Sequence, residues 1–498
     1  MPEASADTSR PRPSISRTIA KNTVFVTLGD IALRGVNFLF GIFVVRQLGD
    51  DQFGRYSIVL AFVGLFQIFA ELGMSQYVMR EIAQDRSKAQ PLFWNLVEVR
   101  LLLALLAIIG IPLGAVAVGY SHELVLGVLF YTFSFLLAAF QIPLVVVLTA
   151  HERLDYATVL HVFGQLLFVV LGGVALLMGG GFIALILVGL MSTPIQIGAA
   201  VWMIKRERLA RLPFRIDPRS WPRLIRASLP FGIISLALTI AFSIDTVMLS
   251  MYEPENVVGW YNVAYGLVRS LMFLFGGFSQ AIVPSLSRAY VSDTHAVELW
   301  YHRSVKVILL LSLPLAVGGM LVAFPLIRFL YTDAFLPAAV GLQVIIWDVP
   351  LLMFTSFCGN MTTVVSEERS AARIYSINAV ANVILNLYAI PRFGLIGAAL
   401  VTVVTDLIGA LQFHFLLRRK LHLPNLTSVL ARALTASAVM GVGVAWVGHL
   451  DLFVRIGVGV LLYAGLVLAL RLIDDTERAA LAQLLRGRRE PHPTKGSV

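Results

Sequence analysis

A few charged residues lie inside long apolar stretches of this sequence, and they are the residues best placed to do chemistry there. Arg269 lies near the middle of the stretch 257–286, with no carboxylate three or four residues away. A charge at the centre of a bilayer costs roughly 2.5–3.5 kcal/mol on insertion scales, so each one needs a partner or a function. A guanidinium can donate two parallel hydrogen bonds to phosphate oxygens. Arg269 is therefore a candidate phosphate contact, with an interhelical salt bridge as the alternative.

A second polar group stands in the first apolar stretch. Asp30, Arg34 and Asn37 follow one another at i, i+4 and i+7, which places all three on one face of a helix. We expect that face to line a cavity. Arg34 is then a second candidate for a diphosphate contact, and the alternative is a structural pair of Arg34 with Asp30.

The second half of the chain carries three acids inside apolar stretches, Asp245, Asp348 and Asp406. One of them can pair with Arg269, and another can take up protons or sodium. The residue types alone do not assign these roles among the three acids. They are candidates for coupling transport to an ion.

Amides and one imidazole complete the set of candidate residues. Asn378, Asn382 and Asn386 stand at i, i+4 and i+8, so they form a polar stripe along one helix face. Such amides suit the hydroxyl groups of sugars, and hydrogen bonds between helices are the equally good alternative. His161 is a candidate proton site, although a structural polar role suits it better.

The elements that position these residues are membrane-spanning helices. The 498 residues are 58% hydrophobic and 14% charged, with a mean hydropathy of +0.82, whereas soluble domains average about 25% charged residues. Apolar stretches of about 20 residues, long enough to cross a bilayer as helices, recur along the chain. We predict an all-α integral membrane protein with fourteen transmembrane helices at 18–45, 56–79, 101–118, 124–150, 157–178, 182–204, 228–251, 257–286, 305–327, 338–365, 374–390, 395–417, 429–447 and 452–470.

The distribution of Lys and Arg residues in the connections between these helices predicts the orientation of the chain in the membrane. With the N-terminus in the cytoplasm, 32 of the 39 Lys and Arg residues fall in cytoplasmic tails and connections. Only five fall outside, and two, Arg34 and Arg269, lie within the predicted helices. The positive-inside rule favours this arrangement, so we expect both termini in the cytoplasm. The longest connection, 205–227, is basic and serves as a linker between two halves or lies on an anionic membrane surface.

Short repeats support the division into halves. Gly-Arg-Tyr at 54–56 recurs as Gly-Trp-Tyr at 259–261, and Gly-Met-Ser-Gln at 73–76 recurs as Gly-Phe-Ser-Gln at 277–280. A weaker echo relates 151–153 to 367–369. Six helices per repeat place a pseudo-two-fold axis along the membrane normal. The expected organisation is a tail (1–17), a six-helix bundle (18–204), the basic linker (205–227), a second six-helix bundle (228–417), helices thirteen and fourteen (418–472) and a tail (473–498).

Two motifs resemble those of a known family. Leu-Gly-Asp-Asp-Gln-Phe-Gly-Arg-Tyr at 48–56 and Glu-Leu-Gly-Met-Ser at 71–75 are similar to motifs of the polysaccharide exporters and O-antigen flippases in the multidrug/oligosaccharidyl-lipid/polysaccharide (MOP) superfamily. The resemblance implies alternating-access flipping of an undecaprenyl-diphosphate-linked oligosaccharide across the bacterial inner membrane, for exopolysaccharide, capsule or O-antigen synthesis. It also implies membrane lipids as surroundings and a polysaccharide polymerase with its chain-length machinery as candidate partners.

Other function classes find little support in the sequence. The phosphate loop of ATPases and the motifs of zinc proteases and serine hydrolases are missing, so we expect neither an enzyme nor a cofactor. Cys358 is the only cysteine, which leaves no thiolate cluster for a metal. The net charge of +10 reflects topology rather than nucleic-acid binding. The alternatives are a peptidoglycan-precursor flippase, a drug/cation antiporter of the same superfamily and, with less support, a membrane glycosyltransferase or polymerase.

Overall fold

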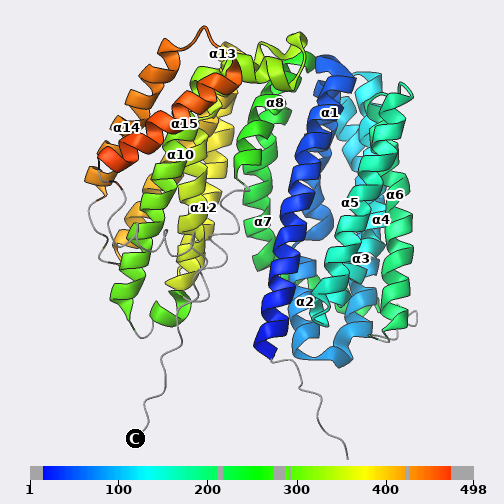
Figure 1. Cartoon of the computed structure of the whole chain (residues 1–498). Coiled ribbons are helices and arrows are strands. Elements are labelled where there is room, and N and C mark those ends of the chain that lie inside the picture. Colours follow the sequence, from blue (N-terminus) through cyan, green and yellow to red (C-terminus); the bar gives the residue numbers. More distant parts are fainter. Residues whose placement is uncertain are drawn as a thin grey trace, which may run out of the picture.

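The computed structural model describes residues 15–207, 209, 217–272, 286–290, 293–421, 423, 426–470 and 472. Side chains are described from residue 33 onward, except at 230, 231, 233, 234, 238, 241 and 294. All regular secondary structure within these ranges is helical, as expected (Figure 1). The part of the predicted eighth helix from 273 to 285, which holds the second copy of the Gly-x-Ser-Gln motif, lies outside the described residues.

The helices follow the apolar stretches closely. The first seven are α1 (Ile15–Glu71), α2 (Met74–Gln84), α3 (Ala89–Val118), α4 (His122–Ala150), α5 (Leu154–Leu177), α6 (Phe182–Arg206) and α7 (Trp221–Leu249). The others are α8 (Glu255–Leu271), α10 (Thr294–Leu330), α11 (Ala338–Ile345), α12 (Asp348–Val364), α13 (Glu368–Arg418), α14 (Thr427–Trp446) and α15 (Leu452–Ala469). Short 3-10 turns occur at Arg86–Lys88, Pro218–Ser220 and Asp333–Phe335.

Two of these helices each consist of two helices joined at a glycine. In α1 the backbone leaves the helical conformation at Gly49, with φ of 73°, and in α13 it does so at Gly394, with φ of 51°. Glycine adopts positive φ without the steric cost that other residues incur. Within the described ranges, nine helices are long and apolar enough to span a membrane, and α11 with α12, bent by 45°, would make a tenth.

The helices gather on two sides of the molecule. Figure 1 shows α1 to α6 on one side and α10 to α15 on the other, with α7 and α8 between them. Helix α7 contacts both α1 and α13, and α8 contacts α1 and α11. We call the end of the molecule that contains Gly49 and Gly394 the turn end, and the opposite end, which contains Lys205 and Lys420, the basic end.

Backbone contact joins the two sides at the turn end. A Cβ atom added to Gly54 would collide with the carbonyl oxygen of Glu255, and one added to Gly259 would collide with the carbonyl oxygen of Asp50. Small residues allow helices to approach this closely in membranes. The two glycines that open the repeated tripeptides therefore meet each other where α1 crosses α8.

Side chains add to this closure. The Arg46 side chain donates to the carbonyl oxygens of Leu330 (2.7 Å) and Phe329 (2.6 Å), at the end of α10. The hydroxyl groups of Tyr120 and Ser250 lie 2.7 Å apart. All three contacts connect residues more than 100 positions apart in sequence. The turn end is thus closed by both backbone and side-chain contacts.

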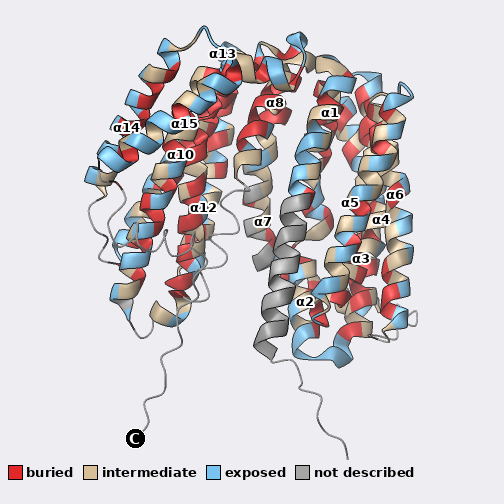
Figure 2. Ribbon diagram, viewed as in Figure 1, coloured by how far each residue is buried: buried red, intermediate tan, exposed pale blue. Residues whose placement is uncertain are grey.

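The outer surface identifies the medium in which the protein lies. Buried residues gather where helices face one another, whereas exposed positions follow the outward faces (Figure 2). Many of those outward residues are large and apolar, such as Leu461 at 75% exposure and Trp446 at 85%. Helices that satisfy their own backbone hydrogen bonds can expose such surface only to lipid. The chain is a multi-pass helical membrane protein.

Candidate functional site

A buried carboxylate on α7 is the centre of the candidate site. The Asp245 side chain is 2% exposed. Its Oδ1 accepts a hydrogen bond from Asn386 Nδ2 (2.6 Å), and its Oδ2 accepts from Thr402 Oγ1 (2.8 Å) and from the hydroxyl of Tyr261 (3.0 Å). The donors come from α8 and from both helices of α13. Every hydrogen bond to this acid therefore comes from a neutral group.

Further oxygens surround the carboxylate. Asn382 Oδ1 accepts a hydrogen bond from Asn386 Nδ2 (3.0 Å). The Oδ1 atom of Asn386 is buried and lacks a donor among the described residues. Buried polar atoms without partners are rare in folded proteins, and each calls for an explanation. Together with Thr402 Oγ1, these oxygens form a small cluster around one negative charge, which suits a monovalent cation or a proton.

A second acidic group lies close by. Asp348, at the start of α12, has no exposed surface, and among the described residues its carboxyl group has no hydrogen-bonding neighbour other than the carboxyl group of Asp406. It interacts electrostatically with Asp406 of α13 and with Asp245. The structure therefore brings together the three acids that the sequence analysis singled out in the second half.

Arg269 is connected to this cluster by contacts between aromatic rings. Its guanidinium lies 5.7 Å from the ring centre of Tyr265 and 5.1 Å from that of Phe242. The Tyr265 ring stacks on Tyr261, a donor to Asp245, at 5.8 Å. Arg269 is exposed, and none of the described carboxylates forms an ion pair with it. The geometry leaves its hydrogen-bond donors available at the edge of the acid cluster.

The asparagine stripe divides between two roles. Asn382 and Asn386 are 4% and 0% exposed and belong to the Asp245 cluster. Asn378 lies one turn earlier, and its Nδ2 packs where a Cβ on Gly409 would lie, at 2.4 Å. Two of the three amides therefore support a buried carboxylate in this conformation, which matches the hydrogen-bonding alternative for the stripe, and the contact with sugar hydroxyls stays a prediction.

No hydrogen bond or ion pair between described side chains joins the candidates of the first half to this cluster. Arg34 and Asn37 on α1 are exposed, and so is His161 on α5. The side chain of Asp30 lies outside the described residues. These four positions therefore keep their predicted roles only as proposals.

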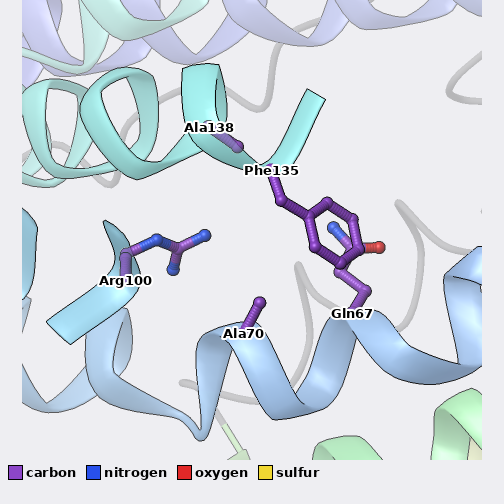
Figure 3. A pocket seen from close by; sticks show the side chains of 5 residues that line it. All are labelled: Gln67, Ala70, Arg100, Phe135 and Ala138. Carbon is purple, nitrogen blue, oxygen red and sulfur yellow. The ribbon is translucent and has the colours of Figure 1, made fainter. Parts of the chain in front are cut away.

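The sequence analysis missed a buried ion pair. It predicted that the third span begins at 101, but α3 begins at Ala89, so Arg100 lies well inside the helix. Arg100 is 4% exposed and forms an ion pair with Glu71. Figure 3 shows its guanidinium pointing into a cavity of about 10 Å³ that Gln67 and Phe135 also line. This volume holds about one water molecule.

The ion pair fixes the sharp bend between α1 and α2. Glu71 Oε1 accepts a hydrogen bond from the backbone N–H of Ser75 (3.1 Å), across Leu72 and Gly73, which both have positive φ (46° and 73°). A left-handed conformation is unfavourable for leucine, so the bend needs this support. The Glu-Leu-Gly-Met-Ser motif therefore encodes a bend held by Arg100. Glu71, the acidic first residue of that motif, was the sequence signal that a basic partner such as Arg100 lies nearby.

Metal chemistry finds no support in the described residues. No group of three or more His, Cys, Asp or Glu side chains among them is arranged to hold a metal ion.

Comparison with known proteins gives consistent matches. A family model described as polysaccharide biosynthesis protein matches residues 19–290, and a model described as MatE matches residues 230–388. The chain is 22% identical over 407 residues to the probable low-salt glycan biosynthesis flippase Agl15 of Haloferax volcanii, covering 80% of this chain and 83% of that protein. It is 27% identical over 176 residues to the probable flippase AglR of the same organism, covering 34% of this chain and 36% of that protein.

Solved structures agree on the fold. The chain is similar to the lipid II flippase MurJ in an inward closed conformation, with a TM-score of 0.72 and 15% identity over 93% of this chain and 100% of that one. It is also similar to an inward-facing multidrug resistance MATE family transporter of the MOP superfamily, with a TM-score of 0.64 and 18% identity over 77% of this chain and 94% of that one. Because the polysaccharide biosynthesis model matches more than half of the sequence, the chain belongs to the polysaccharide biosynthesis protein family, and its fold is that of MOP superfamily transporters.

Proposed function

We propose that this protein flips an undecaprenyl-diphosphate-linked oligosaccharide across the bacterial inner membrane, for exopolysaccharide, capsule or O-antigen synthesis. Its family membership and the glycan flippases among its relatives support this proposal. The observation that carries it is the arrangement of Arg269 beside a buried acid cluster in a multi-pass fold. A free guanidinium suits the diphosphate, and the acids suit a coupling ion.

The proposed topology has fourteen passes. The nine apolar helices and the bent pair α11–α12 account for ten. Helices α1 and α13 count twice because each turns at its glycine, and α7 and α8 complete the number. With the basic end in the cytoplasm, both termini lie there as well, in agreement with the positive-inside rule.

The conformation of the turns supports the six-helix repeat. Glu152, after α4, and Ser366, after α12, are two of the few described non-glycine residues with positive φ (61° and 56°). Gly179, between α5 and α6, and Gly394, between the two helices of α13, also have positive φ (83° and 51°). The two members of each pair are separated by nearly the same number of residues in sequence. This regularity favours two bundles, 18–204 and 228–417, around a pseudo-two-fold axis, with helices thirteen and fourteen appended.

Transport then proceeds by alternating access. The contact of Gly54 with Gly259 closes the turn end in this structure. Opening that end requires the two bundles to separate at the crossing of α1 and α8. Uptake of a monovalent cation or a proton by Asp245, or of a proton by Asp348 and Asp406, would change the charge of the cluster that joins α7, α8 and α13 and so bias this movement.

Within this mechanism each candidate residue has a role. Arg269 and Arg34 contact the diphosphate, and the isoprenoid tail stays in lipid. Asn37 and Asn378 contact sugar hydroxyls when the cavity is open, while Asp30 and His161 tune the charge of the first bundle. These roles are proposals that substitution can test one residue at a time.

Inverted membrane vesicles that carry fluorescently labelled lipid-linked oligosaccharide provide the direct test. We expect Arg269→Ala to reduce flipping strongly and Arg269→Lys to retain part of it, because an ammonium keeps the charge without the paired donors. Arg392→Ala is the matched control, since Arg392 is also exposed and also lies over a tyrosine ring, that of Tyr388 at 3.6 Å. Undiminished flipping by Arg269→Ala would remove that residue from the mechanism.

The same vesicles separate the alternative functions. A peptidoglycan-precursor flippase would move lipid II in preference to oligosaccharide on the same carrier. A drug/cation antiporter would move cationic dyes and neither lipid. Either pattern would overturn the proposed substrate and leave the fold and the family intact.

A further inference from the structure

A groove near the basic end lies outside the candidate site. It has a volume of about 250 Å³ and runs over α4, between α3 and α6. Leu144, 3% exposed, forms part of its buried floor, and Phe140, 36% exposed, lies where it opens to the surface. Ile197 and Val201 of α6 form one wall. The groove is therefore an apolar slot on the outer face of the first six helices.

One charged residue lines the groove. Lys205, in the last turn of α6, is exposed, and it is the only charged residue among those that line the groove. The nearest acid in sequence, Glu207, already accepts hydrogen bonds from Arg153 and from Tyr156. None of the described carboxylates forms an ion pair with Lys205. Its ammonium is thus an uncompensated cation at the end of an apolar slot.

We propose that this groove binds one acyl chain of an anionic phospholipid, with the lipid phosphate on Lys205. The slot follows the helices, which is the direction of acyl chains in a bilayer, and its volume suits part of a chain rather than a folded protein segment. Lysines near helix ends place their ammonium groups at the headgroup level. An uncompensated lysine there favours an anionic headgroup over a zwitterionic one.

The surroundings of Lys205 strengthen the preference for negative charge. Arg206 follows it and lies over the ring of Trp202 at 5.1 Å. Arg223 and Arg226, at the start of α7, are exposed as well. The site thus lies at the most basic end of the molecule. It does not depend on the proposed flippase activity, because it lies apart from the acid cluster and from Arg269.

Native mass spectrometry of the full chain in detergent tests this site. The protein is incubated with phosphatidylglycerol or with phosphatidylcholine that carry identical acyl chains. We expect phosphatidylglycerol to be retained more strongly. Lys205→Ala should weaken its retention about fivefold, the weight of one lysine at an anionic lipid surface, and leave phosphatidylcholine unaffected. Arg392→Ala, which removes an exposed cation at the turn end, is the matched control.

A second variant fills the slot instead of changing its charge. Val201→Trp should reduce the retention of both lipids, because the acyl chain loses its space. Equal retention of the two lipids by the unmodified protein would overturn the proposal, and so would unchanged phosphatidylglycerol binding in both variants. Displacement of phosphatidylglycerol by equimolar undecaprenyl phosphate would also overturn it, in favour of a site for the substrate's tail.

Fluorescence locates the bound chain. Trp94 lines the groove, so phosphatidylglycerol with brominated acyl chains should quench its emission. The quenching should decrease in Trp94→Phe and in Lys205→Ala, and persist in Trp446→Phe, which removes an exposed tryptophan at the end of α14. Equal quenching in all three variants would contradict binding in this groove.

Discussion

Two groups of buried charges among the described residues, at the bend between α1 and α2 and around Asp245, differ in how their charges are balanced. Arg100 and Glu71 neutralise each other at the bend between α1 and α2. Asp245 is held by neutral donors alone, and the carboxyl group of Asp348 has a second acid, Asp406, as its neighbour. A neutralised pair contributes to structure, whereas a buried acid without a cation is poised to take one up. The comparison assigns a structural role to the first cluster and a functional role to the second.

The largest expected effect is on transport, in Asp245→Asn. The variant keeps the shape of the side chain and removes its charge, so flipping should fall on the order of 100-fold, equivalent to about 3 kcal/mol for one charge-assisted interaction. The melting temperature in detergent should change little, because the donors to this residue are neutral. Asp451→Asn, an exposed acid before α15, is the control. Normal transport by Asp245→Asn would end the functional interpretation of the cluster.

Arg100→Leu should show the opposite pattern, with a loss of stability. Removing one member of a buried ion pair costs about 3–5 kcal/mol, because the other charge is left unpaired. Denaturant titration or thermal melting in detergent measures this loss. The double variant Arg100→Leu with Glu71→Leu should recover much of it, since two apolar side chains replace the pair. A single variant as stable as the unmodified protein would show that the pair does not hold the bend.

Asp348→Asn sharpens the comparison within the acid cluster itself. An amide at this position removes the repulsion between the neighbouring carboxyl groups of Asp348 and Asp406, so the variant should gain about 1 kcal/mol in stability. If Asp348 takes part in ion coupling, transport should fall in the same variant. Melting curves and flipping rates measured on one preparation test both effects. A destabilised variant with normal transport would make Asp348 a structural residue instead.

The smallest effect concerns the half-buried ion pair of Arg153 with Glu207. A hydrogen bond from Tyr156, followed by one from Arg153, lowers the pKa of Glu207 below its ordinary value of 4.5. The contribution of ionised Glu207 to the stability of the folded protein is therefore complete above pH 4.5 and is lost as the pH falls through the lowered pKa. When the pH is lowered from 7 to 3, the melting temperature should fall less in Glu207→Gln than in the unmodified protein. Parallel curves would show that this pair adds nothing to stability.

The sequence predicts the helices well because lipid demands a long apolar stretch for each one. The turn within α1 falls at Gly49, between the first two predicted spans, whereas the start of α3 is harder to predict because it lies among polar residues. Because the third span was predicted to begin at 101, Arg100 was placed in the connection before it and was not considered as a buried charge. The bend between α11 and α12 also has no signal in the apolar pattern.

Of the residues that form the candidate site, the charged ones are those that stand out most in the sequence. Asp245, Asp348 and Asp406 stand out because acids are costly in lipid. Thr402 and Tyr261 do not, since neutral residues occur widely in membrane helices. Thr402 lies 157 residues from Asp245 in sequence, so only the folded chain brings them together.

The central claim is that this protein flips lipid-linked oligosaccharide by means of the Asp245 cluster. Proteoliposomes that contain the purified protein, a labelled lipid-linked oligosaccharide and an imposed sodium or proton gradient test it most directly. We predict flipping that one of the two gradients accelerates and that Asp245→Asn slows on the order of 100-fold. Flipping at equal rates by both proteins under every gradient, or none by the unmodified protein, would contradict the claim.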